Sequence, residues 1–142
     1  MRDRSRTELE RRLRQIGFDH DEIRAALDGL EEAGLVDDDR FAQAVVAHET
    51  SSRLSGKRAV MSKLMASGVD RGTAERALGE AGSDPERADA LAARRATRLA
   101  GVAPDVALRR LVSFLVRRGH SPGVAAIAAA RALGTGPPEP RA

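Results

Sequence analysis

Cysteine, tryptophan and tyrosine do not occur in this 142-residue sequence. The lack of cysteine excludes disulfide bridges and thiolate zinc sites. Only three aromatic residues occur, Phe18, Phe41 and Phe114, so the core must consist mainly of leucine, valine, isoleucine and alanine. No apolar run approaches the roughly 20 residues that cross a bilayer, and no secretion signal opens the chain. We therefore expect a soluble, cytoplasmic protein without a membrane span.

The residues that would carry catalysis or hold a cofactor are also missing. The three histidines (His20, His48 and His120) have no second ligand at metal-binding spacing, so we expect no metal site. No glycine pattern resembles a phosphate-binding loop. The acidic run Asp37 to Asp39 could be read as a cation site, but consecutive acids at a helix start point in different directions. A capping role is therefore the better reading. The sequence offers no catalytic candidate and predicts a protein that is not an enzyme and needs no cofactor.

Lysine is nearly absent, with two residues among 24 basic ones, and the charges are segregated along the chain. Residues 19–49 hold ten acids against two arginines, whereas residues 94–131 hold eight arginines against Asp105 alone. Any single arginine is best read as part of a solvated helix face, but an eight-to-one block indicates a basic binding surface. The predicted binding residues for a partner or nucleic acid are Arg53, Lys57, Arg58, Lys63, Arg94, Arg95, Arg98, Arg109, Arg110, Arg117 and Arg118.

One pattern recurs three times at intervals of 51 residues: two apolar residues four apart, a glycine, and then a helix-capping residue. The three sets are Leu9, Leu13, Gly17, Asp19; Val60, Leu64, Gly68, Asp70; and Leu111, Leu115, Gly119, Ser121. Glycine ends a helix in the left-handed conformation, and Asp or Ser caps the next helix. The repeat predicts an all-α protein of tandem three-helix repeats that form an elongated, curved array.

Glycines, prolines and caps divide the chain into about eight helices with short joints. We expect a basic tail over residues 1–6, a helical repeat domain over 7–133, and a disordered tail rich in Gly and Pro over 134–142. The expected units cover about residues 7–53, 55–101 and 103–133, and the last lacks room for its third helix. No segment has the alternation of a strand.

The same reading predicts which apolar side chains lie inside. Phe18 precedes a cap and is expected to pack on Ile23, while Glu22 completes a capping box with Asp19. Phe18 and Phe41 are the predicted core anchors of the first unit. Other residues expected to face inward are Ala26, Leu27, Leu30, Leu35, Val36, Val45, Met65 and Leu108. Asp84 is expected to cap the helix that Pro85 opens.

Residues 8–42 closely resemble the RecX family, which regulates the RecA recombinase. The resemblance rests on L-x-x-x-G-F from Leu13 to Phe18, I-x-x-x-L from Ile23 to Leu27, and L-x-x-x-G-L-V-D-D-x-R-F-A from Leu30 to Ala42. It continues more weakly to Leu133. The family is built from three tandem three-helix units, in agreement with the 51-residue repeat.

The resemblance implies a function. Proteins of this family bind along the groove of the RecA–DNA filament, limit its extension or stability, and so damp recombination, DNA repair by strand exchange and the SOS response. It therefore implies a non-enzymatic RecA inhibitor that acts as a monomer, with RecA as partner and DNA as a second contact. A basic helical-repeat module that binds DNA without RecA specificity is the main alternative, and a scaffold that binds another protein through the acidic segment is the third. The scarcity of aromatics that could stack on bases disfavours direct DNA binding.

Overall fold

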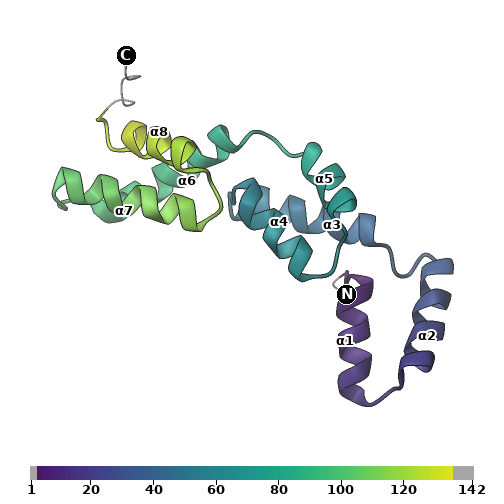
Figure 1. The fold of residues 1–142 in the computed structure, drawn as a ribbon. Coiled ribbons are helices and arrows are strands. Elements are labelled where there is room, and N and C mark those ends of the chain that lie inside the picture. Colours follow the sequence, from purple (N-terminus) through teal and green to yellow (C-terminus); the bar gives the residue numbers. More distant parts are fainter. Residues whose placement is uncertain (1–2, 136–142) are drawn as a thin grey trace. The chain divides into compact units, whose positions relative to one another are not determined.

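The computed structural model describes residues 3–135, and every regular element in that range is a helix. Strands are absent from this part of the chain, as the sequence predicts. The elements are α1 (Arg6–Ile16), α2 (His20–Glu32), α3 (Asp38–Ala47), the π-helix η1 (His48–Ser52), α4 (Lys57–Ala66), α5 (Arg71–Gly79), α6 (Asp84–Ala96), the 3-10 helix η2 (Thr97–Leu99), α7 (Pro104–Arg117) and α8 (Pro122–Ala132) (Figure 1).

The repeated glycines end helices as predicted. Gly17, Gly68 and Gly119 have φ angles of 113°, 80° and 96°, which lie in the left-handed region that favours glycine. The cap residue after each turn accepts a backbone N–H, at 2.9 Å for Asp19, 2.9 Å for Asp70 and 3.4 Å for Ser121. The all-α repeat is therefore encoded locally, at the ends of its helices.

The chain divides into two compact units. Unit 1 comprises Met1–Ala47 and Met61–Glu80, and unit 2 comprises His48–Val60 and Ala81–Ala142. In unit 1, α1 packs on α2 and α3 packs on α5. In unit 2, α6, α7 and α8 pack on one another as a three-helix bundle.

The three-helix bundle of unit 2 begins at α6, whereas the predicted units begin near residues 7, 55 and 103. A repeat pattern fixes the period of a helical array but not the helix at which a group starts, which explains the difference. The proposed unit boundaries stay a prediction. Ser5 and Arg6, assigned to the basic tail, form the cap and first residue of α1, and residues 136–142 of the predicted C-terminal tail lie outside the described part.

The core of unit 2 is aliphatic. Leu111 and Leu115 on α7 are fully buried against small residues of α6 and α8, with Ala92 and Ala129 among them. Burial of one leucine side chain contributes about 1.5–3 kcal/mol. Because alanine brings the helix backbones close together, a few leucines are enough to fill this interior.

In unit 1 the expected burial is confirmed at Phe41, which is 2% exposed, and at Leu27 and Val36. It is wrong at Phe18, which is 47% exposed. Residues at the end of α4 and in the turn after α2 also differ from expectation, since Met65 and Leu35 are exposed. Helical periodicity places a side chain on a face, but another segment must cover that face before the side chain is buried.

Three further expectations about helix ends and faces are corrected, the first at Ala26, which is exposed. Leu30, Val45 and Leu108 are half-buried, and Leu108 packs against the core of unit 2 as expected. Asp19 accepts the Glu22 N–H, but the reciprocal capping box occurs at Ser5 and Glu8 instead. Ser83 is the N-cap of α6, which moves Asp84 into the first turn. There its carboxylate accepts a hydrogen bond from the backbone N–H of Lys57 at 3.2 Å. It also accepts one from the Arg87 guanidinium. Asp84 therefore joins two segments.

Candidate anion-binding groove

Unit 2 carries a groove between the α6–η2 segment and α7. Five arginines from the two segments line it: Arg95, Arg98, Arg109, Arg110 and Arg117. The other lining residues are Leu99, Leu111, Ser113 and Phe114. Its cavity volume is about 490 Å³. A second cavity of about 250 Å³ shares Arg95, Arg98 and Phe114 and adds Leu91, Arg94 and Arg118. We call the two together the arginine groove.

Helix periodicity explains why the arginines gather here. Leu111 and Leu115 face the core of the bundle, so Arg110 and Arg117, seven residues apart, both lie on the outer side of α7. The sequence predicts that these two share a face, and both line the groove. On the opposite wall, Arg95 lies in the last turn of α6 and Arg98 lies in η2.

Phe114 organises the floor of the groove. The Arg95 guanidinium lies 4.5 Å from the centroid of its ring, and that of Arg118 lies 5.6 Å from it. Cation–π contacts of this kind contribute about 0.5–2 kcal/mol. The Phe114 ring therefore stabilises the Arg95 and Arg118 guanidiniums near each other, with no carboxylate between them.

Arg118 is the most enclosed of these arginines. One of its terminal nitrogens donates to the Arg53 carbonyl, and its buried Nε has no hydrogen-bond partner within residues 3–135. Desolvation lowers the pKa of Arg118, and the nearby Arg53 charge adds to this effect. An anion in the second cavity would relieve both costs.

The groove has no acid in its walls, and the nearest acidic influence is that of Glu49 on Arg118. No Asp or Glu lines either cavity, and within the described part of the chain no carboxylate forms an ion pair with Arg95, Arg98, Arg110 or Arg117. Guanidinium groups bind phosphate and carboxylate through paired N–H donors. Two facing walls of arginines without carboxylate partners have the donor set that an extended or multiply charged anion requires.

The structure thus brings seven of the eleven predicted binding residues together. Arg53 lies beside the groove, where its backbone carbonyl accepts a hydrogen bond from Arg118. The Arg53 guanidinium is 3.8 Å from the Glu49 carboxylate. Lys57 and Arg58 are exposed in unit 2 but do not line the groove. Lys63 belongs to unit 1. Whether any of the eleven binds a partner stays a prediction.

Sequence reasoning missed Phe114 and Ser113. Phe114 lies four residues after Arg110 and four before Arg118, a spacing that places all three along one side of a helix. That spacing was the available signal, since an aromatic residue beside arginines in so aromatic-poor a chain is unusual.

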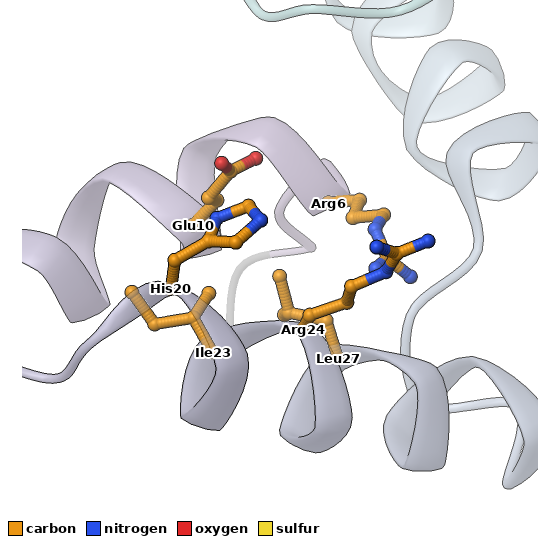
Figure 2. A pocket seen from close by; sticks show the side chains of 6 residues that line it. All are labelled: Arg6, Glu10, His20, Ile23, Arg24 and Leu27. Atoms are coloured by element: carbon orange, nitrogen blue, oxygen red, sulfur yellow. The ribbon is translucent and has the colours of Figure 1, made fainter.

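A smaller hollow lies between α1 and α2 in unit 1, with a volume of about 150 Å³. Figure 2 shows Glu10 and His20 toward one end and the guanidiniums of Arg6 and Arg24 toward the other, with Ile23 and Leu27 on α2. Arg6 is already paired, at 2.9 Å with Asp28 and 2.8 Å with Glu31. The hydrogen bond that Arg6 donates to the Glu31 carboxylate raises the pKa of Arg6. Its charges are of both signs, so this hollow is a weaker anion site than the arginine groove.

The histidines and acids of the described residues form no group that could hold a metal ion. His120 is fully buried in unit 2, where its Nε2 lies 2.9 Å from the Leu54 carbonyl oxygen. No helix among the described residues is both long and apolar enough to cross a membrane.

Comparisons with known proteins assign the family. Residues 1–30 match the first three-helix domain of RecX, and residues 37–78, which contain α3, α4 and α5, match the second. The regulatory protein RecX of Corynebacterium efficiens is 38% identical over 93% of this chain, which spans 66% of that protein. The regulatory protein RecX of Amycolatopsis mediterranei is 36% identical over 88% of this chain and 73% of its own length.

Solved structures agree with the fold. A crystal structure of RecX from Lactobacillus salivarius aligns with a TM-score of 0.76 at 22% identity, covering 92% of this chain and 86% of that one. A second crystal structure of regulatory protein RecX aligns with a TM-score of 0.76 at 20% identity, covering 86% of this chain and 61% of that one. With two matching domains and relatives above 35% identity, the chain belongs to the RecX family.

Proposed function

We propose that this protein is a non-enzymatic inhibitor of the RecA recombinase that binds the RecA–DNA filament through the arginine groove. The observation that carries the proposal is the convergence of unpaired guanidiniums in one groove of a chain whose relatives are named regulatory proteins. Binding of an inhibitor in the filament groove limits extension or stability of the filament and damps recombination and SOS induction. We place this action in the cytoplasm and assign it to a monomer.

The electrostatics support this proposal. The groove presents a concentrated positive field, which would draw the protein toward an acidic filament surface or toward DNA phosphates. The fold is a helical repeat, an architecture that typically binds partners along extended surfaces. Metal-ligand groups are absent from the described residues. The groove itself contains one hydroxyl, from Ser113, with no histidine beside it to act as a base.

A second candidate is a DNA-binding module without RecA specificity. The observation that favours it is the pairing of guanidiniums with the half-buried ring of Phe114 in the same groove. Arginine and aromatic groups together bind single-stranded nucleic acid. The two candidates differ in whether the essential contact lies on RecA or on DNA.

The test is RecA ATP hydrolysis on single-stranded DNA, titrated with this protein at fixed salt and repeated with excess single-stranded DNA. Inhibition that persists with excess DNA places the contact on RecA and supports the proposal. Inhibition that disappears when DNA is in excess indicates competition for DNA, and the second candidate is then correct. ATP hydrolysis by the protein alone would contradict both.

A further inference from the structure

Five described turns share one backbone structure, in which a glycine of positive φ ends a helix; two of them follow α2 and α8, where Leu35 donates to Leu30 and Thr135 to Ala130, each at 2.9 Å. The other three are related by the 51-residue repeat. In each, the residue after the glycine donates its N–H to the carbonyl five residues earlier: Phe18 to Leu13 at 3.2 Å, Val69 to Leu64 at 3.1 Å, and His120 to Leu115 at 3.1 Å. This bond and the left-handed glycine define a Schellman turn. The three turns close α1, α4 and α7, and they lie 51 residues apart.

The turn after α4 is covered by the start of α1. The Ser5 hydroxyl donates to the Ser67 carbonyl oxygen at 2.6 Å, and Ser5 is fully buried. Thr7 lies so close to Gly68 that a Cβ on that glycine would be 2.1 Å from the Thr7 hydroxyl oxygen. The glycine therefore serves two purposes, since it permits the turn and admits a neighbouring helix start.

The turn after α7 is covered in the same way by the start of α4. The Gly56 N–H donates to the Arg118 carbonyl at 2.9 Å, and the Arg58 N–H donates to that of Gly119 at 3.3 Å. A Cβ on Gly119 would lie 2.5 Å from the Cβ of Ala59. The partners in the two joints are also 51 residues apart, Ser5 with Gly56 and Ser67 with Arg118, so the joint itself is a repeated element.

The turn after α1 has no such cover within residues 3–135. Nothing lies within 4 Å of the position of a Cβ on Gly17, and no described group donates to the Ile16 carbonyl. Ile16 is 61% exposed and Phe18 is 47% exposed. Val69 and His120, which occupy the positions equivalent to Phe18 in the other two turns, are buried. The surface that receives a helix start in the other two turns is thus preformed and open here.

We propose that the Ile16–Phe18 turn is a docking site for the N-terminus of a helix presented by a partner protein. The two internal joints define the chemistry of that ligand. Ser5-Arg6-Thr7-Glu8-Leu9 and Gly56-Lys57-Arg58-Ala59-Val60 share a small residue at the cap, a basic residue next, and an apolar residue three positions further. The cap donates to the carbonyl before the glycine, and the bare glycine lets the helix approach.

A second copy of this chain is a poor ligand for the turn. The starts of α1 and α4 are already engaged. The residue equivalent to Gly56 in the third repeat is Ala107, which lies inside α7 and donates its N–H to the Ala103 carbonyl at 2.8 Å. Among the described residues no helix start of the required kind is free, which favours a partner protein over a second copy of residues 3–135. The inference is independent of the arginine groove and of RecA.

The test uses the full chain labelled with ¹⁵N and a peptide of residues 54–66 that carries an Ala-rich extension at its C-terminus, with helicity checked by circular dichroism. We expect saturable shifts of the Gly17 and Phe18 amide signals. The matched control is the same peptide with Gly56→Val, because a Cβ at Gly56 lies 2.3 Å from a backbone oxygen in the native joint. We expect it to bind at least about tenfold more weakly.

Variants of the protein complete the test. Phe18→Asp should abolish the shifts, and Leu35→Asp, at another exposed position of unit 1, should leave them unchanged. The proposal is overturned if the helical peptide leaves Gly17 unaffected, if both peptides bind equally, or if only Gly68 or Gly119 responds. Shifts of the Gly17 signal that grow with protein concentration without peptide would assign the site to a second copy and contradict the choice of a partner protein.

Discussion

Substitution of Gly119 by alanine should destabilise unit 2 more than the same substitution at Gly101. Both glycines lie in unit 2 and have positive φ angles, 96° and 81°. A Cβ on Gly119 would lie 2.5 Å from the Cβ and the backbone nitrogen of Ala59, whereas nothing lies within 4 Å of a Cβ on Gly101. The pair therefore separates the cost of the backbone conformation from the cost of obstructing the helix joint.

The magnitudes follow from these contacts. Alanine in the left-handed region costs about 1–2 kcal/mol, and both variants bear that cost. Overpacking adds about 1–3 kcal/mol, and only Gly119→Ala bears it. We expect losses of about 1–2 kcal/mol for Gly101→Ala and about 2–5 kcal/mol for Gly119→Ala. Adding Ala59→Gly to Gly119→Ala should recover part of the loss, since the backbone nitrogen of residue 59 remains in place.

The assay is urea unfolding followed by circular dichroism at a helical wavelength, since the chain has no tryptophan or tyrosine to report by fluorescence. Both substitutions lie in the same unit, so one unfolding transition reports both free energies. Equal losses for the two variants would refute the argument, because they would mean that the joint between α4 and α7 tolerates an added methyl group.

Three other outcomes are expected. Phe41→Ala should cost about 3–5 kcal/mol, and Phe18→Ala less than about 1.5 kcal/mol, measured as thermal midpoints; a Phe41→Ala midpoint within a degree or two of wild type would contradict the packing. The Thr73 N–H, 2.9 Å away, lowers the pKa of Asp70 in the folded protein below its ordinary 3.8, so its stabilisation is present above that pH and is lost as pH falls below it. Asp70→Asn should therefore flatten the acid side of the stability profile, and an unchanged slope in urea midpoints would contradict this. Phe114→Leu should weaken filament inhibition while changing the free energy of unfolding in urea by less than about 1 kcal/mol; undiminished inhibition would contradict a role of the ring in the site.

The sequence predicts the helix ends well because those signals are local. A glycine and a cap residue two positions later act on the same few backbone groups wherever they occur, so Gly17, Gly68 and Gly119 all end helices as expected. The burial of Phe18 is not a local property. Val69 holds the same place in the repeat and is buried, so local pattern alone does not decide whether the position is covered.

Asp84 illustrates competition between a local and a distant role. A proline after an acid suggests an N-cap, but Ser83 takes the cap position without a side-chain bond. The Asp84 carboxylate instead joins the start of α4 to Arg87. Residues 27 positions apart in the sequence have no local signal that they meet.

The candidate site was predictable in composition and not in shape. The eight-to-one charge block identifies the arginines, and their spacing on α7 places Arg110 and Arg117 on one side. Arg95 lies across the groove from Arg110 and Arg117 because of the way α6 packs on α7. That packing depends on the alanine-rich interface of unit 2. Phe114 enters the site for the same reason.

The most direct test of the account is the salt dependence of binding to RecA filaments on single-stranded DNA, compared between wild type and Arg110→Glu/Arg117→Glu. Both arginines are exposed and lie outside every ion pair of the described residues, so the double variant should fold normally. A matched control reverses Arg4 and Arg12, two exposed arginines of unit 1 that also lie outside the ion pairs of the described residues.

We predict weaker binding for the groove variant, with a slope of log affinity against log salt that is shallower by about 2, and binding close to wild type for the control. A folded groove variant that binds and inhibits as wild type does, with an unchanged slope, would contradict the claim that the arginine groove contacts the filament.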